Sequence, residues 1–479
     1  MDRSDRERVP LALAGVNQPR LRPQASWLDC AAMSIFKAYD IRGVVPDEMA
    51  ADDVYRIGRA VARWLAAAEL AVGRDARRSS PELADALLRG INDEGVSVVD
   101  LGLVSTPMLY FAVEELALAG GVMITASHNP GQYNGLKICR EHAIPVGGDS
   151  GLQEIERLAS AAHGLARTQR GSVRSADVRD GYVRHVLSAG GRCPRLRVAI
   201  DCGNGMSSVG LERLLPELPL EVERLYFEPD GGFPNHEADP LKRENLDDLI
   251  AAVKRGGAQL GIAFDGDGDR AMFVDDAGEP ITADLITGLL AASQLRRHGG
   301  TGLILYDLRS SRATAEAIVE AGGTPEMCRV GHAFIKAQMR ESGAVFAGEL
   351  SGHFYFRFSP TLVHDDGTAA FVALLDVLAE TGKPLSELVR PLRRYAASGE
   401  INRRVADTPG LLAALEADHA GKAEISRLDG LLVRYPDWWF NVRASNTEPV
   451  VRLNLEAADD AAMRARRDAV LARIAQFSQ

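Results

Sequence analysis

Short apolar runs and amphipathic stretches alternate along most of the chain. The apolar runs, rich in β-branched residues, predict strands at 70–73, 97–101, 121–124, 197–200, 259–264 and 302–306. The amphipathic stretches predict helices at 51–68, 81–94, 150–162, 246–255 and 283–295. Strands and helices that alternate in this way predict an α/β protein.

Breaks in this pattern divide the chain into segments. They fall near 170–176, 276–280 and 397–402. At 479 residues the chain is too long for one hydrophobic core, so several domains are expected. We predict α/β domains at 34–173, 174–279 and 280–393, and a smaller last domain at 394–479. Residues 1–33 contain only a very short apolar stretch, so we expect a disordered extension or a misassigned start rather than a secretion signal.

Composition and charge narrow the class of protein. The chain is 46% hydrophobic and 25% charged, which is typical of folded globular domains. No apolar stretch approaches the roughly 18 residues that a membrane span needs. The net charge of -11 opposes general nucleic-acid binding, so an anionic ligand would need a local cluster of Arg and Lys. The 5 cysteines are scattered without a C-x-x-C pair, which favours a reducing cytoplasm over a disulfide framework or a zinc site.

Four apolar runs end in loops that are dense in polar functional groups. These loops lie at 120–130, 259–270, 343–353 and 438–449, one in each predicted domain. Loops that follow strand ends carry the chemistry of most α/β domains. We therefore expect the four loops to share one cleft.

The second loop carries three carboxylates at alternate positions, Asp265, Asp267 and Asp269, with glycines between them. The glycines let the backbone curl so that all three carboxylates face one hard cation, and magnesium prefers oxygen ligands. A solvated acidic turn is the plain alternative. A calcium loop of the EF-hand type fits poorly, because Arg270 stands where that loop needs glycine and a strand-like run precedes it where a helix is needed.

The first loop offers Ser127 as a nucleophile, with His128 and Asn129 beside it. A serine hydroxyl is a weak nucleophile because its high pKa keeps it protonated, so it needs a neighbouring base or cation to react. Alone, such a segment is more often an ordinary turn, and the glycines of the esterase motif G-x-S-x-G are absent here. The aspartate loop elsewhere in the chain is what favours a catalytic role for Ser127.

The third and fourth loops offer groups that bind sugars and phosphates. Glu349, Ser351 and His353 alternate, so an extended loop would point all three toward vicinal sugar hydroxyls. The fourth loop combines a guanidinium with short hydrogen-bonding side chains, which suits a phosphate dianion. Its members are Arg443, Ser445, Asn446 and Thr447. Each of the two loops, taken alone, could also be an ordinary polar turn.

These four loops, in this order, resemble the four signatures of the α-D-phosphohexomutase family, which includes phosphomannomutases and phosphoglucomutases. The resemblance runs from about Ser34 to the C-terminus and includes the segments at 39–43 and 331–336. It implies four domains around a central cleft: three related α/β domains with mixed sheets, and a C-terminal α+β domain like the TATA-box-binding protein. That fold name implies nothing about DNA binding.

The resemblance also implies roles for individual residues. Ser127 would carry the phosphoryl group and, together with Asp265, Asp267 and Asp269, would bind one magnesium ion per chain. Glu349 and Ser351 would contact the sugar hydroxyls, and the fourth loop would hold the phosphate that is not reacting. Further substrate contacts are expected from Tyr39, Arg270, Arg309 and His353. The candidates for proton transfer are Lys137, Arg42, His128 and His332.

The implied reaction is reversible phosphoryl transfer between the 1- and 6-positions of a hexose. It passes through a hexose 1,6-bisphosphate, which also serves as the activator. A phosphoserine of about -2 charge, three aspartates and one magnesium ion give the site a net charge of about -3. Cations must offset this charge, because phosphoryl transfer depends mainly on positioning and electrostatics. Many relatives have lysine where this chain has Arg309, and arginine does not readily give up its proton, so we expect no proton transfer there.

The substrate is expected to be mannose or glucose phosphate, and no residue decides between them. Leu350 stands where phosphoglucosamine mutases of the family typically have glutamine, which disfavours glucosamine. We expect a cytoplasmic isomerase, a monomer or homodimer, without nucleic-acid or membrane partners. Two other classes stay open: a magnesium-dependent sugar phosphatase, in which water takes the phosphoryl group, and a non-catalytic sugar-phosphate-binding protein.

Overall fold

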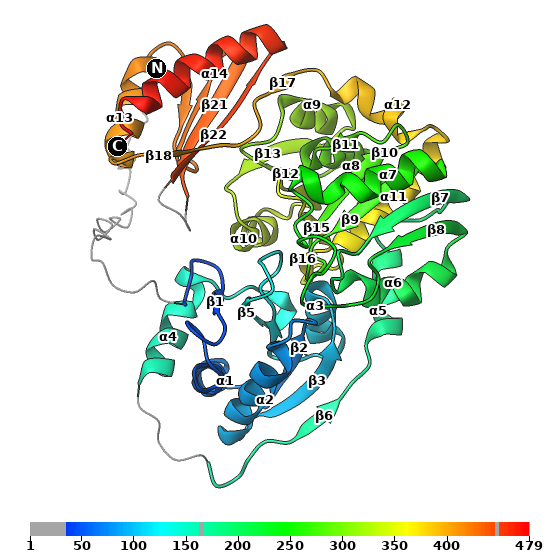
Figure 1. The fold of residues 1–479 in the computed structure, drawn as a ribbon, viewed down its shortest axis with the longest axis vertical. Helices are drawn as coiled ribbons and strands as arrows, with labels where there is room; N and C mark the ends of the chain where they lie inside the picture. Colours follow the sequence, from blue (N-terminus) through cyan, green and yellow to red (C-terminus); the bar gives the residue numbers. More distant parts are fainter. Residues whose placement is uncertain (1–34, 162–166, 446–449, 479) are drawn as a thin grey trace, which may run out of the picture. The chain divides into compact units, whose positions relative to one another are not determined.

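The computed structural model describes residues 35–161, 167–445 and 450–478, so the predicted N-terminal extension lies outside the described residues. The described chain contains four β-sheets that follow one another in sequence (Figure 1). The first three are mixed sheets covered by helices, and the fourth is antiparallel throughout. The predicted α/β class, with a different last domain, is confirmed. Among the described residues, no helix combines the length and apolar character that crossing a bilayer requires.

The first sheet has the strand order β1-β5-β4-β2-β3-β6. Its strands are β1 (Ile41–Val44), β2 (Glu69–Arg74), β3 (Ser97–Leu103), β4 (Gly120–Ile124), β5 (Tyr133–Arg140) and β6 (Val173–Ser175). Its helices are α1 (Ala51–Leu65), α2 (Ser80–Asp93), α3 (Thr106–Glu115) and α4 (Leu152–Ser160). β4 is buried along its whole length, as its uninterrupted apolar sequence requires.

The second sheet has the order β11-β10-β9-β7-β8. Its strands are β7 (Leu196–Asp201), β8 (Leu220–Leu225), β9 (Leu260–Phe264), β10 (Ala271–Asp275) and β11 (Pro280–Ile281). Its helices are α5 (Arg179–Leu187), α6 (Ser207–Leu214) and α7 (Asp247–Gly256). β9 and β10 form an antiparallel pair, and the aspartate loop connects them.

The third sheet has the order β13-β12-β14-β15-β16. Its strands are β12 (Leu303–Asp307), β13 (Thr324–Cys328), β14 (Phe346–Gly348), β15 (Phe354–Arg357) and β16 (Val363–Asp365). Its helices are α8 (Ala283–Arg297), α9 (Arg312–Glu320), α10 (His332–Ser342), α11 (Gly367–Thr381) and α12 (Leu385–Val389). The Asp366 side chain caps α11 by accepting a hydrogen bond from the Ala369 amide.

The fourth sheet has the order β17-β22-β21-β20-β19, and β18 also pairs with β22. Its strands are β17 (Ala396–Ala397), β18 (Ile401–Arg404), β19 (Glu424–Ser426), β20 (Leu431–Arg434), β21 (Trp438–Ala444) and β22 (Val450–Ala457). Its helices are α13 (Thr408–His419) and α14 (Asp460–Ala475), and α14 packs against β22 and β17 (Figure 1). The sheet and its helices enclose a separate apolar core.

The three mixed sheets repeat one arrangement. In each, three parallel strands lie beside one antiparallel strand, giving the matching orders β5-β4-β2-β3, β10-β9-β7-β8 and β15-β14-β12-β13. The loop that turns from the last parallel strand into the antiparallel strand is β4–β5, β9–β10 or β14–β15. These are the first three polar loops of the sequence, and the fourth connects the antiparallel pair β21 and β22. The first three candidate loops therefore occupy equivalent places in their sheets, and the fourth lies in a hairpin of an antiparallel sheet.

The six predicted strands and five predicted helices all have counterparts, with ends that differ by a few residues. The predicted breaks contain short strands that the pattern did not reveal. β6 lies in the break at 170–176 and pairs with β3 although all three of its residues are exposed, so it carries no apolar signal. β11 and β17 are only two residues long. The domain limits given above stay a prediction.

Candidate functional site

The predicted nucleophile Ser127 lies in the β4–β5 loop and is 2% exposed. Its backbone is in the left-handed region, with φ of 51°. Its amide donates a hydrogen bond to Thr125 Oγ1 at 3.0 Å. Its hydroxyl donates to Asp265 Oδ2 at 2.9 Å and lies 3.2 Å from His128 Nδ1. The hydroxyl thus stands between a carboxylate of the β9–β10 loop and an imidazole of its own loop.

A buried arginine that the sequence analysis missed supports this loop. Arg77 is 1% exposed, and its Nε lies 3.0 Å from Asp75 Oδ2. Its guanidinium donates four hydrogen bonds to backbone carbonyls of the serine loop: those of Ser127, Asn129, Pro130 and Tyr133. A lone arginine between a strand and a helix has no periodic signal, so only its contacts reveal its position.

Two glycines let the serine loop and the aspartate loop meet. A Cβ atom on Gly266 would lie 2.4 Å from the carbonyl oxygen of Ser127, closer than real Cβ contacts come. Gly268 has φ of 80°, which side chains disfavour. The alternation of aspartate and glycine is therefore required by close backbone approach as well as by the turn.

The three aspartates of the β9–β10 loop converge, as predicted. One oxygen from each of Asp265, Asp267 and Asp269 lies within 4.8 Å of the others, and all three residues are buried. Thr106, at the first turn of α3, donates its hydroxyl to Asp267 Oδ2 at 2.6 Å. Strands, not helices, precede and follow this loop, which excludes a calcium loop of the EF-hand type.

The charge and the hydrogen bonding of the aspartate cluster favour a bound cation. Asp267 Oδ1 is buried without a hydrogen-bond partner in the described part of the chain. Burial, and then repulsion by Asp269 and Asp267, raise the pKa of Asp265 well above its ordinary value. A buried set of oxygen donors with an unpartnered oxygen fits a hard divalent ion such as magnesium.

Lys137, on β5, supplies the cluster with one positive charge. Its Nζ lies 2.6 Å from both Asp267 Oδ2 and Asp269 Oδ2. Burial opposes the charge of Lys137, but the two aspartates outweigh burial and raise its pKa above the ordinary value. Burial would also raise the pKa of Asp269, yet Lys137 and then His353 hold it well below its usual range. Lys137 therefore stays charged in this geometry.

The β14–β15 loop places Glu349, Ser351 and His353 together. His353 Nδ1 lies 3.0 Å from Ser351 Oγ and 3.4 Å from Glu349 Oε2. Glu349 also accepts hydrogen bonds from Tyr355 Oη at 2.7 Å and from Arg309 Nη2 at 3.3 Å. Leu350 donates its amide to Asp307 Oδ2 at 2.6 Å, which fixes the loop to the end of β12.

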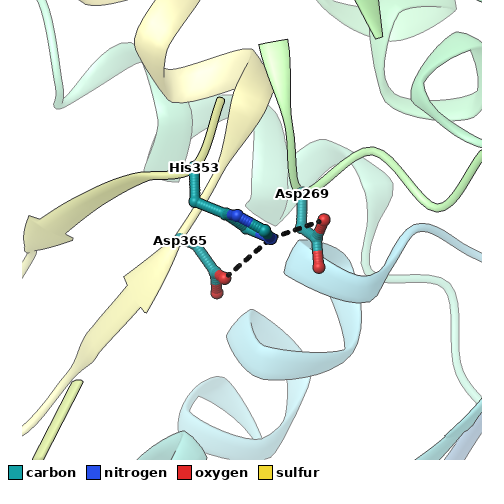
Figure 2. Close-up of side chains that lie close together, drawn as sticks. All are labelled: Asp269, His353 and Asp365. Carbon is teal, nitrogen blue, oxygen red and sulfur yellow. Dashed lines mark ion pairs between the residues drawn. The ribbon is translucent and has the colours of Figure 1, made fainter. Parts of the chain in front are cut away.

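His353 connects the sugar loop to the aspartate cluster. Figure 2 shows its imidazole between Asp269 and Asp365, with Nε2 at 3.3 Å and 3.9 Å from their carboxylate oxygens. Burial and Arg270 oppose its protonation, but Asp269 and Glu349 raise the pKa of His353 to about 9. Arg270 Nε is 3.2 Å from the same imidazole nitrogen and 3.7 Å from Asp265 Oδ2.

A buried pair, which the sequence analysis did not assign, lies behind His353. Lys336 Nζ is 2.8 Å from Asp365 Oδ1, both side chains are fully buried, and the amine lies 4.4 Å from the centroid of the Tyr110 ring. Lys336 belongs to the segment at 331–336 that the sequence analysis noted, so a charged residue within that segment was the available signal.

Aromatic residues of the 39–43 and 331–336 segments pack against each other, and Arg42 of the first segment contacts the serine loop. The Tyr39 ring packs against His332 and Phe334, with centroids 5.9 Å and 5.6 Å away. Burial and Lys336 lower the pKa of His332 to about 3, so its imidazole is neutral. Arg42, on β1, donates to Asn129 Oδ1 of the serine loop at 2.6 Å and pairs with Asp40.

The fourth loop is described only in part, because Asn446 and Thr447 lie outside the described residues. Arg443 Nη2 is 3.0 Å from Glu400 Oε2, and Arg452 Nη1 is 2.9 Å from Glu400 Oε1. Ser445 Oγ accepts a hydrogen bond from Arg452 Nη2 at 3.3 Å. Arg309 Nη1, at the end of β12, is 3.7 Å from the same Glu400.

A continuous series of contacts joins the four loops. Each link connects a residue of one loop, or its immediate support, to the next. In order they are Ser127–Asp265, Asp269–His353, Glu349–Arg309, Arg309–Glu400 and Glu400–Arg443. The residues named in these links therefore form one connected polar network.

The fold and this network point to a class: a multidomain α/β enzyme in which the buried Ser127 lies against buried carboxylates, an arrangement suited to metal-assisted phosphoryl transfer. Family models of phosphoglucomutase/phosphomannomutase match the chain in four consecutive parts. These are α/β/α domain I at 33–163, domain II at 180–278, domain III at 282–395 and the C-terminal domain at 400–473.

Individual relatives agree with these models. A phosphomannomutase/phosphoglucomutase of Pseudomonas syringae pv. tomato is 42% identical over 439 residues, which cover 89% of this chain and 92% of the relative. The crystal structure of a phosphoglucomutase/phosphomannomutase family protein from Burkholderia thailandensis matches with a TM-score of 0.84 and 37% identity, covering 92% of this chain and 97% of that one. The chain belongs to the phosphoglucomutase/phosphomannomutase family, which confirms the resemblance.

A more distant structure shares the fold. It is the N-acetylphosphoglucosamine mutase of Aspergillus fumigatus in complex with GlcNAc-6P and magnesium, with a TM-score of 0.63 at 14% identity, covering 93% of this chain and 96% of that one. A protein that shares this fold has thus been solved with magnesium. In this chain, the buried aspartate cluster could hold a metal.

Proposed function

We propose that the protein is a magnesium-dependent phosphohexomutase that moves a phosphoryl group reversibly between the 1- and 6-positions of mannose or glucose phosphate. Phospho-Ser127 would donate to the free hydroxyl, and the resulting hexose 1,6-bisphosphate would return its other phosphate to Ser127. The observation that carries this proposal is the Ser127 hydroxyl, 2.9 Å from Asp265 inside the buried carboxylate cluster. A serine there can pass on a phosphoryl group while bulk water is kept away.

The proposed metal ligands are Ser127, once phosphorylated, and the three aspartates Asp265, Asp267 and Asp269. Magnesium bound there would neutralise charge on the transferring phosphoryl group. The oxygen-only donor set and the unpartnered Asp267 Oδ1 support this assignment. One ion per chain, with a hexose 1,6-bisphosphate as activator, completes the cofactor proposal.

The cations around Ser127 would bind the anionic substrate and the transferring group. Lys137 and Arg270 contact the aspartate cluster directly, so they offset its charge. His128 lies within reach of the serine hydroxyl, so it is one proposed proton-transfer group. His332 is the other, and because burial and Lys336 lower its pKa to about 3, its imidazole is neutral and only weakly basic. Arg42 completes the set of proposed catalytic groups through its contact with the serine loop.

The proposed substrate contacts come from the third and fourth loops. Glu349 and Ser351 would bind the sugar hydroxyls, and His353 holds both of them in place. The phosphate that is not reacting would lie against Arg309, Arg443 and Ser445, with Asn446 and Thr447 as further proposed ligands. Tyr39 would contact the substrate from beside His332.

The setting of the enzyme is also a proposal. We infer a cytoplasmic enzyme, a monomer or homodimer, that acts on small hexose phosphates. In the described part of the chain, the cysteines Cys139, Cys193, Cys202 and Cys328 are free thiols, which is typical of a reducing compartment.

The test is ³¹P NMR of the purified protein with magnesium and a trace of glucose 1,6-bisphosphate, with mannose 1-phosphate and glucose 1-phosphate in separate tubes. We expect conversion to the 6-phosphates, and the two rates rank the sugars. Ser127→Ala should abolish conversion, because it removes the hydroxyl that would carry the phosphoryl group. Addition of a chelator should do the same, and magnesium should restore the activity.

The outcomes separate the alternatives. Net release of free phosphate would identify a phosphatase instead, since water would then be the acceptor. Binding of a hexose phosphate without turnover, in protein that carries a phosphoryl group on Ser127, would favour a sugar-phosphate-binding protein.

A further inference from the structure

Three arginines converge on one glutamate at the fourth loop. Glu400, between β17 and β18, receives Arg443 Nη2 at 3.0 Å, Arg452 Nη1 at 2.9 Å and Arg309 Nη1 at 3.7 Å. The side chains of Arg309 and Arg443 are 8% and 7% exposed, whereas those of Glu400 and Arg452 are 25% exposed. The cluster is therefore buried on the side of the first two arginines and open to solvent on the side of Glu400.

The arginines carry more positive charge than Glu400 alone can balance. Arg309 is already paired with Asp307 at 2.8 Å and with Glu349 at 3.3 Å. Burial and then repulsion by Arg309 lower the pKa of Arg443, so these two cations disfavour each other. In the described part of the chain, Arg443 Nε is buried without a hydrogen-bond partner. A buried guanidinium with an unused donor is a site that a phosphate dianion satisfies better than a single carboxylate.

The Glu400 side chain can move away from the three arginines. It lies in the segment that joins two edge strands of the fourth sheet, and its side chain faces solvent on one side. The preceding Gly399 has no atom within 4 Å of the position that a Cβ would take, so the backbone there is uncrowded. Arg443 and Arg452 donate charge-assisted hydrogen bonds to the Glu400 carboxylate, and an incoming phosphate dianion can accept the same bonds in its place.

We propose that Glu400 is a built-in competitor of the substrate phosphate: its carboxylate occupies the anion site formed by Arg309, Arg443 and Arg452, and a phosphate dianion displaces it. The site would thus be neutralised in the absence of ligand. It would also bind phosphate more weakly than three arginines alone would, which speeds release. Arg452 becomes a further phosphate ligand. The inference rests on the proposed function only in taking a hexose phosphate as the natural ligand.

The test compares four proteins: wild type, Glu400→Gln, Arg452→Met and Glu424→Gln. The last is the matched control, because Glu424 pairs with Arg434 on the same sheet and its removal changes the net charge equally. Binding of inorganic phosphate is measured by titration calorimetry at low ionic strength, and thermal unfolding checks that each variant is folded. We expect Glu400→Gln to bind phosphate about tenfold more tightly, because one repelling charge is gone. Arg452→Met should bind it more weakly, and Glu424→Gln should match wild type.

Steady-state kinetics add a second readout. Glu400→Gln should lower the KM for the hexose phosphate without raising kcat, because both the substrate and the product are held more tightly. Unchanged or weaker phosphate binding in folded Glu400→Gln would overturn the proposal and leave Glu400 as a residue that orients the arginines. Phosphate binding does not require turnover. A wild type without mutase activity would therefore refute the proposed function and leave the competition at Glu400 to be judged by the calorimetry.

Discussion

Arg77 offers the sharpest test of how the serine loop is held. Its buried guanidinium pairs with Asp75 and donates to four backbone carbonyls of the loop, including that of Ser127 at 2.8 Å. The backbone of Ser127 is held at a positive φ of 51°, a conformation that costs roughly 1–3 kcal/mol for a residue other than glycine. Arg77 therefore stabilises a strained conformation that places the nucleophile.

The expected loss of stability follows from the buried groups that lose their partner when Arg77 is replaced. Arg77→Met leaves Asp75 buried without its partner, and breaking a buried ion pair in this way costs about 3–5 kcal/mol. The carbonyl oxygens of the loop lose their donors as well, at about 1 kcal/mol or more each where water cannot replace them. We expect the first domain to lose about 4 kcal/mol of stability or more. Arg77→Lys keeps the charge but cannot reach all five acceptors, so we expect roughly half that loss.

The effect on catalysis is expected to be larger than the loss of stability alone explains. A reacting group displaced by about 1 Å can cost on the order of 100-fold in rate. Folded Arg77→Lys should therefore show a kcat reduced by about 10- to 100-fold with little change in KM. Arg78→Met is the matched control, since Arg78 is the exposed neighbour. Hydrogen exchange of peptides from 120–140 reports the opening of the loop, and the mutase assay reports turnover. Wild-type protection and turnover within twofold in Arg77→Met would refute this reasoning.

Two further predictions concern buried charges. Lys137 holds two of the carboxylates that a metal needs, so Lys137→Met should bind magnesium about tenfold more tightly by calorimetry while losing most turnover, and weaker binding would contradict this. Burial, which outweighs hydrogen bonds from Ala369 and Tyr182, raises the pKa of Asp366 from 3.8 to about 7. Since the native state keeps a proton that the unfolded chain releases, this group lowers stability as pH rises from about 4 to 7. In Asp366→Asn, the side-chain oxygen that caps α11 is retained. The stability of this variant relative to wild type should therefore be greater at pH 8 than at pH 5, by up to about 3 kcal/mol. Equal urea midpoint shifts at both pH values would disprove the assignment.

The strands and motif loops could be predicted because they carry local signals. Buried strands such as β4 and β9 are continuous apolar runs, and their period and composition are visible without a partner. The aspartate loop is equally visible, because three carboxylates at alternate positions are oxygen donors of the kind that a hard cation needs. By contrast, β6 is exposed, and it is a strand only because β3 offers it an edge.

The supporting residues could not be predicted, because their partners are distant in the sequence. Arg77 contacts a carbonyl that lies 50 residues away, and Thr106 contacts Asp267 across 161 residues. Glu400 lies in an ordinary polar segment, and nothing near it in the sequence indicates three arginine partners. A single polar side chain has no periodicity, so its role becomes visible only when the fold brings its partners to it.

The charges of the network explain why its four loops must assemble together. Lys137, from the first sheet, is buried against aspartates of the second, and His353, from the third, lies against Asp269. Arg309 of the third sheet meets Glu400 of the fourth. A buried charge without a partner costs several kcal/mol, so Lys137, whose ion pairs are with Asp267 and Asp269, depends on the second sheet to stay buried and charged. Each domain therefore completes the charge balance of its neighbour, and separating any two of them should expose or neutralise the groups that the proposed reaction needs.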